Sequence, residues 1–402
     1  MKRKCLWLLC IAYIILHVTG CSGKSDGLND EILAFIERQE EFVKEKDMNG
    51  YIDTITTDSP EYVAEKKSWM RDIVKHDISE YQLKAEKIQF VSDDQAHVVV
   101  SQTYQYNGEK YKTKYPLVLR KVNGMWKDSD MLFEEMETEH FLIKYFEPSE
   151  KYAVMIRDVC ETAYEDITER YGDKIYDKTV IKVYNDKELL RQSVKLSFAW
   201  QFAGWYEYPE SIKTTEYPNK RDYMEILEHE LIHKITIQQS NNNMPYWFTE
   251  GVAVYFANFP NQPDLFSSRE YYKEVYGEEA MDILKLEATN LEKLENDDEI
   301  SNYYDSSGMV VKFLVDTYGM KGIKEIIGAL GQYEYIEGTG AEVDPISQKR
   351  FHEVVKKVLG KDIQQLNKEW IEYLYHNVSK AAEETPLFFL SLFIYRGFLK
   401  YE

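Results

Sequence analysis

A pair of histidines separated by three residues is the strongest chemical signal in the chain. His229 and His233 flank Glu230 in the string His-Glu-Leu-Ile-His. On a helix, residues four apart lie on one face, so both imidazoles can bind one metal ion. Zn²⁺ suits such ligands, and a catalytic zinc site keeps one coordination position open for water. Glu230 could accept a proton from that water as it attacks a carbonyl.

A third metal ligand is predicted seventeen positions further along the chain. Glu250 lies in the segment Pro-Tyr-Trp-Phe-Thr-Glu-Gly-Val-Ala-Val-Tyr-Phe, which reads as the start of a second helix. The intervening residues leave room for the first helix to end and the second to return. We therefore expect His229, His233 and Glu250 to bind Zn²⁺ as a set of two imidazoles and a carboxylate.

These two motifs together resemble the gluzincin peptidases, specifically the bacterial peptidase MA-like group, over roughly residues 137–378. The resemblance implies a zinc-dependent peptidase in which Glu230 is the general base. Relatives of the thermolysin type carry an aspartate four positions after the ligand glutamate, where it orients a zinc-bound histidine. This chain has Val254 there. Asp222 and Glu225 are nearby acids that the sequence does not place against an imidazole.

Two further site residues follow from the same resemblance. The segment 302–319 resembles a family helix, which implies that Tyr304 stabilises an oxyanion; a packing tyrosine is the alternative. Gluzincins also bind substrate along an edge strand, which would lie within residues 203–215. Gly204 would there permit close approach of a substrate backbone, and a surface hairpin is the alternative.

The first residues are typical of a targeting segment. Three basic residues precede a short apolar run from Leu6 to Val18, which is too short to span a bilayer. The following Val-Thr-Gly-Cys resembles the lipobox of bacterial lipoproteins. It implies cleavage before Cys21, a lipid on its thiol, and a place on the extracytoplasmic face of the cell membrane; an ordinary secretory signal is the alternative. Cys160 would then be the one unmodified cysteine, which leaves no intramolecular disulfide.

The remaining pattern predicts two α+β domains. After a tether at 21–29, residues 30–134 show two helical stretches and then strands joined by Asn-Gly turns at 107–108 and 123–124. This order resembles the cone-shaped ketosteroid-isomerase-like fold and suggests a spacer or a docking module for a protein partner. Residues 137–378 show the order of a zincin (thermolysin-like) domain with a mixed sheet and metal-bearing helices. The apolar tail at 379–402 could pack on that domain or lie at the membrane.

Charge and motifs leave two classes of function open. The net charge of −21 disfavours nucleic acid, because phosphate contacts need lysine and arginine. The first class is a zinc peptidase that hydrolyses extracytoplasmic peptides or proteins. The second is a non-catalytic lipoprotein that uses a zincin fold to bind a partner. The presence of Glu230 favours the first class, because a purely structural metal site needs no base.

Overall fold

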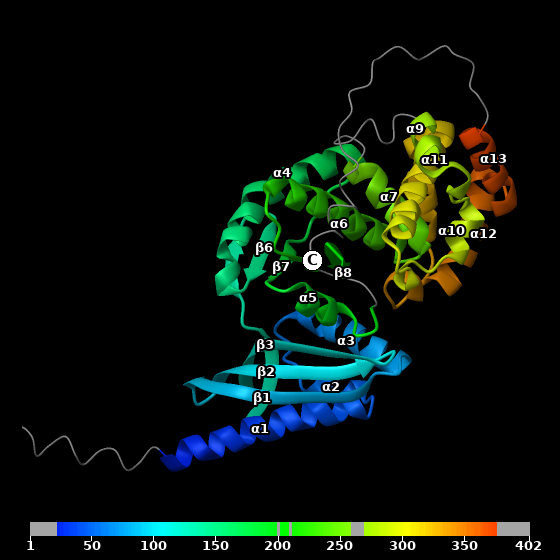
Figure 1. Ribbon diagram of the computed structural model, residues 1–402. Helices are drawn as coiled ribbons and strands as arrows, with labels where there is room; N and C mark the ends of the chain where they lie inside the picture. Colours follow the sequence, from blue (N-terminus) through cyan, green and yellow to red (C-terminus); the bar gives the residue numbers. More distant parts are fainter. Residues whose placement is uncertain (1–21, 199–201, 209–210, 259–268, 376–402) are drawn as a thin grey trace, which may run out of the picture. The chain divides into compact units, whose positions relative to one another are not determined.

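The computed structural model describes residues 22–198, 202–208, 211–258 and 269–375 (Figure 1). Its contacts divide the chain into two units, residues 1–59 with 74–132 and residues 60–73 with 133–402. Both units combine helices with a sheet, which confirms the predicted α+β class with two domains. Within the described ranges, no helix is both long and apolar enough to cross a membrane. Cys21, the preceding signal segment and the tail at 379–402 lie outside these ranges, so the predictions made for them stay predictions.

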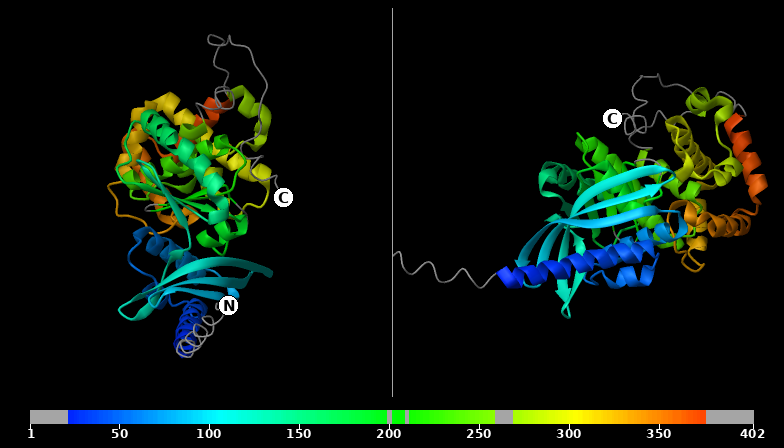
Figure 2. Two further views of the ribbon diagram at one scale, coloured as in Figure 1. Left: turned by 90° about the vertical axis from the view of Figure 1, so that its left-hand side faces the viewer. Right: turned by 60° about the horizontal axis from the view of Figure 1, so that its bottom comes forward.

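The first unit is a four-stranded antiparallel sheet with helices packed on it (Figure 2). Its strands follow the chain in the order β1-β2-β3-β4. The elements are α1 (Ser22–Lys44), α2 (Met48–Asp53), β1 (Ser79–Ser92), β2 (Gln95–Tyr106), β3 (Glu109–Val122) and β4 (Met125–Met131). Both predicted Asn-Gly turns form: Asn107 and Gly108 have φ values of 49° and 85°, and the second pair repeats this geometry. Positive φ at both turn positions suits the twist of the strands.

Helix α1 corrects one expectation. The chain is already helical from Ser22, whereas the sequence predicted a flexible tether up to Asn29. Gly23 and Gly27 suggested an irregular segment, but a helix that has formed is extended at small cost by one residue at a time. The predicted second helix forms as α3 (Pro60–Lys75), and its residues up to Ile73 group with the second unit.

The sheet of the second unit has five strands in the order β5-β6-β7-β9-β8. They are β5 (Glu134–Glu137), β6 (Phe141–Tyr145), β7 (Thr179–Tyr184), β8 (Gly204–Glu207) and β9 (Ser211–Thr215). The three central strands are parallel, because α4 (Glu150–Tyr171) and α5 (Lys187–Val194) carry the chain back between them. β5 and β8 pair antiparallel at the two edges.

Alternate residues of the central strands serve two different faces of the sheet. Ile143, Ile181 and Ile212 are fully buried in the core that the sheet shares with α4 and α6 (Lys220–Ser240). The residues that follow them in each strand are lysines, which point to the opposite face because side chains alternate along a strand. The sheet is therefore buried on both faces.

The rest of the second unit is helical and completes the core around α6 (Figure 1). The helices are α7 (Tyr246–Asn258), α9 (Arg269–Tyr276), α10 (Ile283–Ala288), α11 (Asp297–Leu330), α12 (Asp344–Leu359) and α13 (Ile363–Tyr375). α7 packs against both α6 and α11. α4 ends at Gly172, whose φ of 78° is the left-handed conformation that glycine adopts readily.

Candidate metal centre

Helix α6 presents the two histidines on one face. Asn219 caps its first turn by accepting a hydrogen bond from the backbone N–H of Asp222, and Asn241 ends it with a φ of 51°. The apolar residues Leu227, Leu231 and Ile235 are buried in the core and fix the rotation of the helix. The opposite stripe, with both histidines, therefore faces the cavity at the edge of the sheet.

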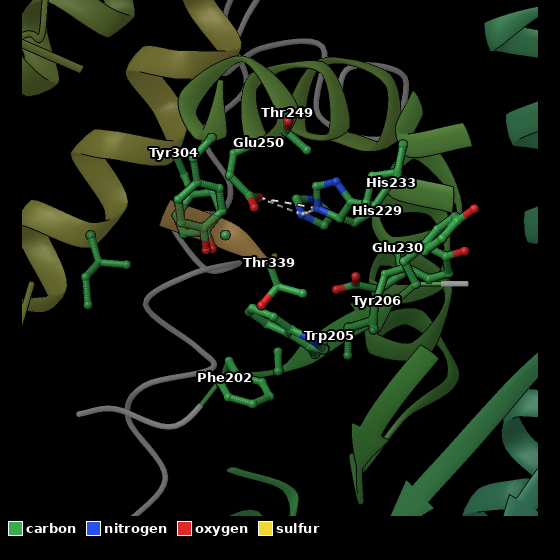
Figure 3. Close-up of a pocket in the computed structure, with 18 of the residues that line it drawn as sticks. Phe202, Trp205, Tyr206, His229, Glu230, His233, Thr249, Glu250, Tyr304 and Thr339 are labelled. Carbon is green, nitrogen blue, oxygen red and sulfur yellow. Dashed lines mark hydrogen bonds and ion pairs between the residues drawn. The ribbon is translucent and has the colours of Figure 1, made fainter. Parts of the chain in front are cut away.

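Helix α7 places the Glu250 carboxylate next to His229 and His233. The carbonyl of Pro245 accepts hydrogen bonds from the N–H groups of Phe248 and Thr249, which forms the first turn just before Glu250. Gly251 lets α7 approach α11 closely, because a Cβ atom at this position would lie 2.5 Å from the carbonyl oxygen of Ser307. The close contact of the two helices places the Glu250 side chain over α6 (Figure 3).

The three predicted ligands converge with the spacing of a tetrahedral metal site. The Nε2 atoms of His229 and His233 lie 3.1 Å apart. Glu250 Oε2 lies 3.2 Å from the first of them and 3.5 Å from the second. Tetrahedral ligands at zinc bond lengths of about 2.0–2.1 Å are separated by about 3.3 Å. The side chains therefore form a candidate His-His-Glu metal site in their present positions.

The two histidines favour the charged form of Glu250. Burial works to raise the pKa of Glu250, but His233 and His229 outweigh it and lower the pKa to about 2. Glu250 is thus a carboxylate at neutral pH, as a metal ligand must be.

Glu230 lies beside the ligands on α6 and is buried. Burial raises its pKa to about 7, with a further rise from Glu250 and opposition from His229. The backbone N–H of Tyr206 in β8 donates a hydrogen bond to it. A carboxyl group at this position can exchange a proton with a water or ligand bound at the metal.

Gly204 lies directly against the side chain of Glu230. A Cβ atom here would lie 2.6 Å from Oε1 of Glu230 and 2.8 Å from Cγ2 of Ile226. The missing side chain makes room for the Glu230 carboxyl group against β8. Gly204 also lines the cavity, so its predicted role in substrate binding stays a prediction.

Tyr304 lies on α11, on the far side of the cavity from Glu230 (Figure 3). Its side chain is buried, and its ring centre lies 6.3 Å from that of His229 in an edge-to-face arrangement. The ring therefore packs beside a metal ligand. Its predicted role as an oxyanion donor stays a prediction.

The ring of His233 has no hydrogen bond on the side away from the metal ligands, among the described residues. Nδ1 of His233 is buried and has no hydrogen-bond partner among the described residues. Val254, four positions after Glu250, is fully buried. The nearby acids have other partners: Glu225 pairs with Arg221, and Asp222 accepts a hydrogen bond from Asn219. Acids or carbonyls that orient a metal-bound histidine raise metal affinity or activity by about 10- to 100-fold, so the site lacks one such contribution at His233.

An open cavity of about 130 Å³ leads to the three ligands. An aromatic wall on this cavity is formed by Phe202, Trp205, Tyr206, Tyr208, Tyr217, Tyr246 and Tyr304. The segment Gly338-Thr339-Gly340 also lines the cavity, and Figure 3 shows Thr339 next to the ring of Trp205. Sequence reasoning missed Thr339; the two glycines around it were the one local sign of a special backbone there. Trp205 was not named, although it lies within the segment 203–215 that was predicted to bind substrate.

The first unit matches a known family. A family model described as "Anti-sigma-I factor RsgI9, C-terminal domain" matches residues 34–137, about a quarter of the chain. No curated protein sequence matches the chain.

Solved structures resemble the chain only weakly in sequence and in backbone superposition. An NTF-2-like protein of unknown function from Shewanella oneidensis is 16% identical with a TM-score of 0.22, over 25% of this chain and 93% of its own. Native yeast LTA4 hydrolase is 10% identical with a TM-score of 0.35 and covers 77% of this chain. The chain spans about half of that hydrolase, 47% of its length. TM-scores this low assign neither a fold nor an activity to this chain.

The family match overturns the function that the sequence motifs predicted. An anti-sigma factor is a regulator, so the prediction of a zinc-dependent peptidase, and with it the description of the chain as a hydrolase or protease, is wrong. The motif at residues 229–233 predicted the converging side chains but not their use.

Proposed function

We propose that the chain is a regulatory protein whose second unit binds Zn²⁺ and holds a segment of a partner protein beside it. His229, His233 and Glu250 would bind the metal through Nε2, Nε2 and a carboxylate oxygen. The observation that carries this proposal is their spacing of 3.1–3.5 Å, which suits tetrahedral zinc. Zinc would supply one further coordination position for a carbonyl, carboxylate or water of the bound segment.

The cavity around the ligands supports a peptide as the occupant. β8 is an edge strand of the described sheet and lines the cavity, so an extended segment could pair with its backbone. The aromatic wall offers apolar surface for the side chains of that segment. Glu230 would then accept a hydrogen bond from the segment or from a metal-bound water.

A regulatory role is supported by the match of the first unit to a domain of an anti-sigma-I factor. We propose that this unit docks a protein partner of the same regulatory system. We also propose that a lipid on Cys21 holds the protein at the extracytoplasmic face of the cell membrane, where the partner segment would be met.

The test is a selection of random peptides on the full-length chain in mild detergent, loaded with Zn²⁺. The proposal expects peptides that bind the loaded wild type and fail to bind Glu250→Gln, which lacks one ligand. Mass spectrometry after incubation should find the selected peptides intact. Equal binding to both proteins would remove the metal from the proposal, and cleaved peptides would contradict a purely regulatory use of the site.

A further inference from the structure

A row of three lysines crosses the outer face of the five-stranded sheet. Lys144 in β6 is in register with Lys182 in β7, which is in register with Lys213 in β9. Neighbouring strands lie about 4.8 Å apart, so the three side chains follow one another closely. All three are buried, Lys182 and Lys213 completely. Such a row of buried like charges needs counter-charges from another element.

Helix α3 supplies these counter-charges. Glu61 Oε1 lies 3.1 Å from Nζ of Lys144. Glu65 Oε2 lies 3.0 Å from Nζ of Lys182 and 3.4 Å from Nζ of Lys213. The hydroxyl of Ser211 in β9 donates a further hydrogen bond of 2.6 Å to Glu65. One face of α3 thus matches the lysine row in both spacing and charge.

The next turns of α3 hold the segment that leads from α5 to the cavity. The indole N–H of Trp69 donates to the carbonyl of Gln192 at 3.0 Å. Asp72 accepts a hydrogen bond of 3.0 Å from the backbone N–H of Ser197 and another from its hydroxyl. Lys195 lies between these two anchored residues.

Lys195 joins two walls of the cavity. Its Nζ lies 5.6 Å from the ring centre of Trp205. The same atom donates to Glu292 Oε1 at 3.2 Å and to the carbonyl of Thr339 at 3.4 Å. Glu292 also accepts a hydrogen bond from the backbone N–H of Ala341. The aromatic wall and the segment at 338–341 are therefore both positioned by one buried cation.

A second route from α3 to the cavity runs through the sheet. Lys213, which pairs with Glu65, also lies 3.6 Å from Oε2 of Glu207 in β8. Glu207 accepts a hydrogen bond of 3.2 Å from the indole N–H of Trp205. The backbone of Tyr206, between them, binds Glu230 beside the metal ligands. Contacts are thus continuous from α3 to the candidate metal centre.

The position of α3 in the sequence suggests a role for these contacts. The chain on both sides of residues 60–73 belongs to the first unit, so α3 reaches the second unit as an inserted segment. We infer that α3 is a coupling helix whose docking on the sheet of the second unit positions the walls of the metal cavity. Docked, it neutralises the lysine row and fixes β8 and residues 338–341; displaced, it releases both. This inference depends on the proposed function in one respect, namely that Zn²⁺ is the ligand bound in the cavity.

Coupling of this kind is reciprocal, so an occupant of the cavity must also stabilise the docked helix. The test is amide hydrogen exchange by mass spectrometry on the full-length chain, with and without Zn²⁺. Exchange in residues 60–73 should slow on the order of tenfold when zinc binds. Zinc protection confined to α6 and α7 would overturn the coupling while leaving zinc binding intact.

Two variants test the same link in the absence of metal. Trp69→Phe removes the hydrogen bond to Gln192, and Asp72→Asn weakens the two hydrogen bonds from Ser197. Each should speed exchange in residues 204–207 and 338–343 on the order of tenfold, with α6 unchanged. The control Glu37→Gln makes a similar small change at an exposed position of α1 and should alter neither segment. Faster exchange in α3 alone would overturn the inference, whether or not zinc binds.

Discussion

Gly204 in β8 and Glu230 in α6 fit together so closely that a single methyl group would separate them. A Cβ atom at position 204 would lie 2.6 Å from Oε1 of Glu230. The contact ties the edge strand of the sheet to the helix that carries both histidines, and it explains why Glu230 is buried beside the metal ligands.

Replacing Gly204 by alanine tests this contact. We expect Gly204→Ala to lower the free energy of unfolding by about 1–3 kcal/mol, because the new methyl group displaces both Glu230 and Ile226. Calorimetry would measure the change. The control is Gly328→Ala in α11, where nothing lies within 4 Å of the added atom, and we expect about 0.4–1 kcal/mol of stabilisation there. Equal effects at both positions would show that Gly204 has no special neighbour.

The buried ion pairs of Glu65 with Lys182 and Lys213 should contribute strongly to the free energy of unfolding. Removing one partner of a buried ion pair leaves the other charge uncompensated, at a cost of about 3–5 kcal/mol. We expect Glu65→Gln to show this loss by calorimetry. Glu86 pairs with Lys114 on the surface of the first unit, so Glu86→Gln should change the melting temperature little. If Glu65→Gln lowered the melting temperature as little as Glu86→Gln does, the result would contradict the assigned role of α3.

Asp305 gives the protein a predictable dependence on pH. Burial raises its pKa to about 6, although a hydrogen bond from Tyr276 opposes the rise. The unfolded chain has an aspartate pKa of about 3.9, so the folded state keeps the proton to higher pH. Stability is therefore lost as pH rises from about 4 to about 6, and the full cost, up to about 3 kcal/mol, persists above that range.

Asp305→Asn removes this cost. The variant should be more stable than the wild type at about pH 8, and the difference should disappear near pH 3.5, where the wild-type group is neutral in both states. Melting temperatures at the two pH values measure it. A constant difference across the range would mean that Asp305 does not titrate as its burial implies.

Local sequence signals predicted much of the fold. The Asn-Gly turns and the spacing of the two histidines each depend on neighbours a few residues away, and each is observed. The convergence of Glu250 on the histidines was also predicted, because two helices joined by a short turn have few ways to pack.

Other features depend on residues far apart in the sequence, and no local pattern reveals them. α3 groups with the second unit because Glu65 meets Lys182, which lies 117 positions away. Lys195 and Thr339 meet across 144 positions and form part of the cavity wall. The use of the site was predicted wrongly, because a motif describes how side chains can bind a metal and not what the bound metal serves.

Calorimetric titration of the metal-free, full-length chain with Zn²⁺ tests the central claim most directly. We predict one zinc per chain for the wild type and for Glu230→Gln, and loss of that binding in His233→Ala and Glu250→Gln. Zinc at a hundredfold excess over its Kd should also stabilise the folded wild type by about 2.7 kcal/mol. No binding to the wild type, or binding to His233→Ala as tight as to the wild type, would contradict a metal centre at His229, His233 and Glu250.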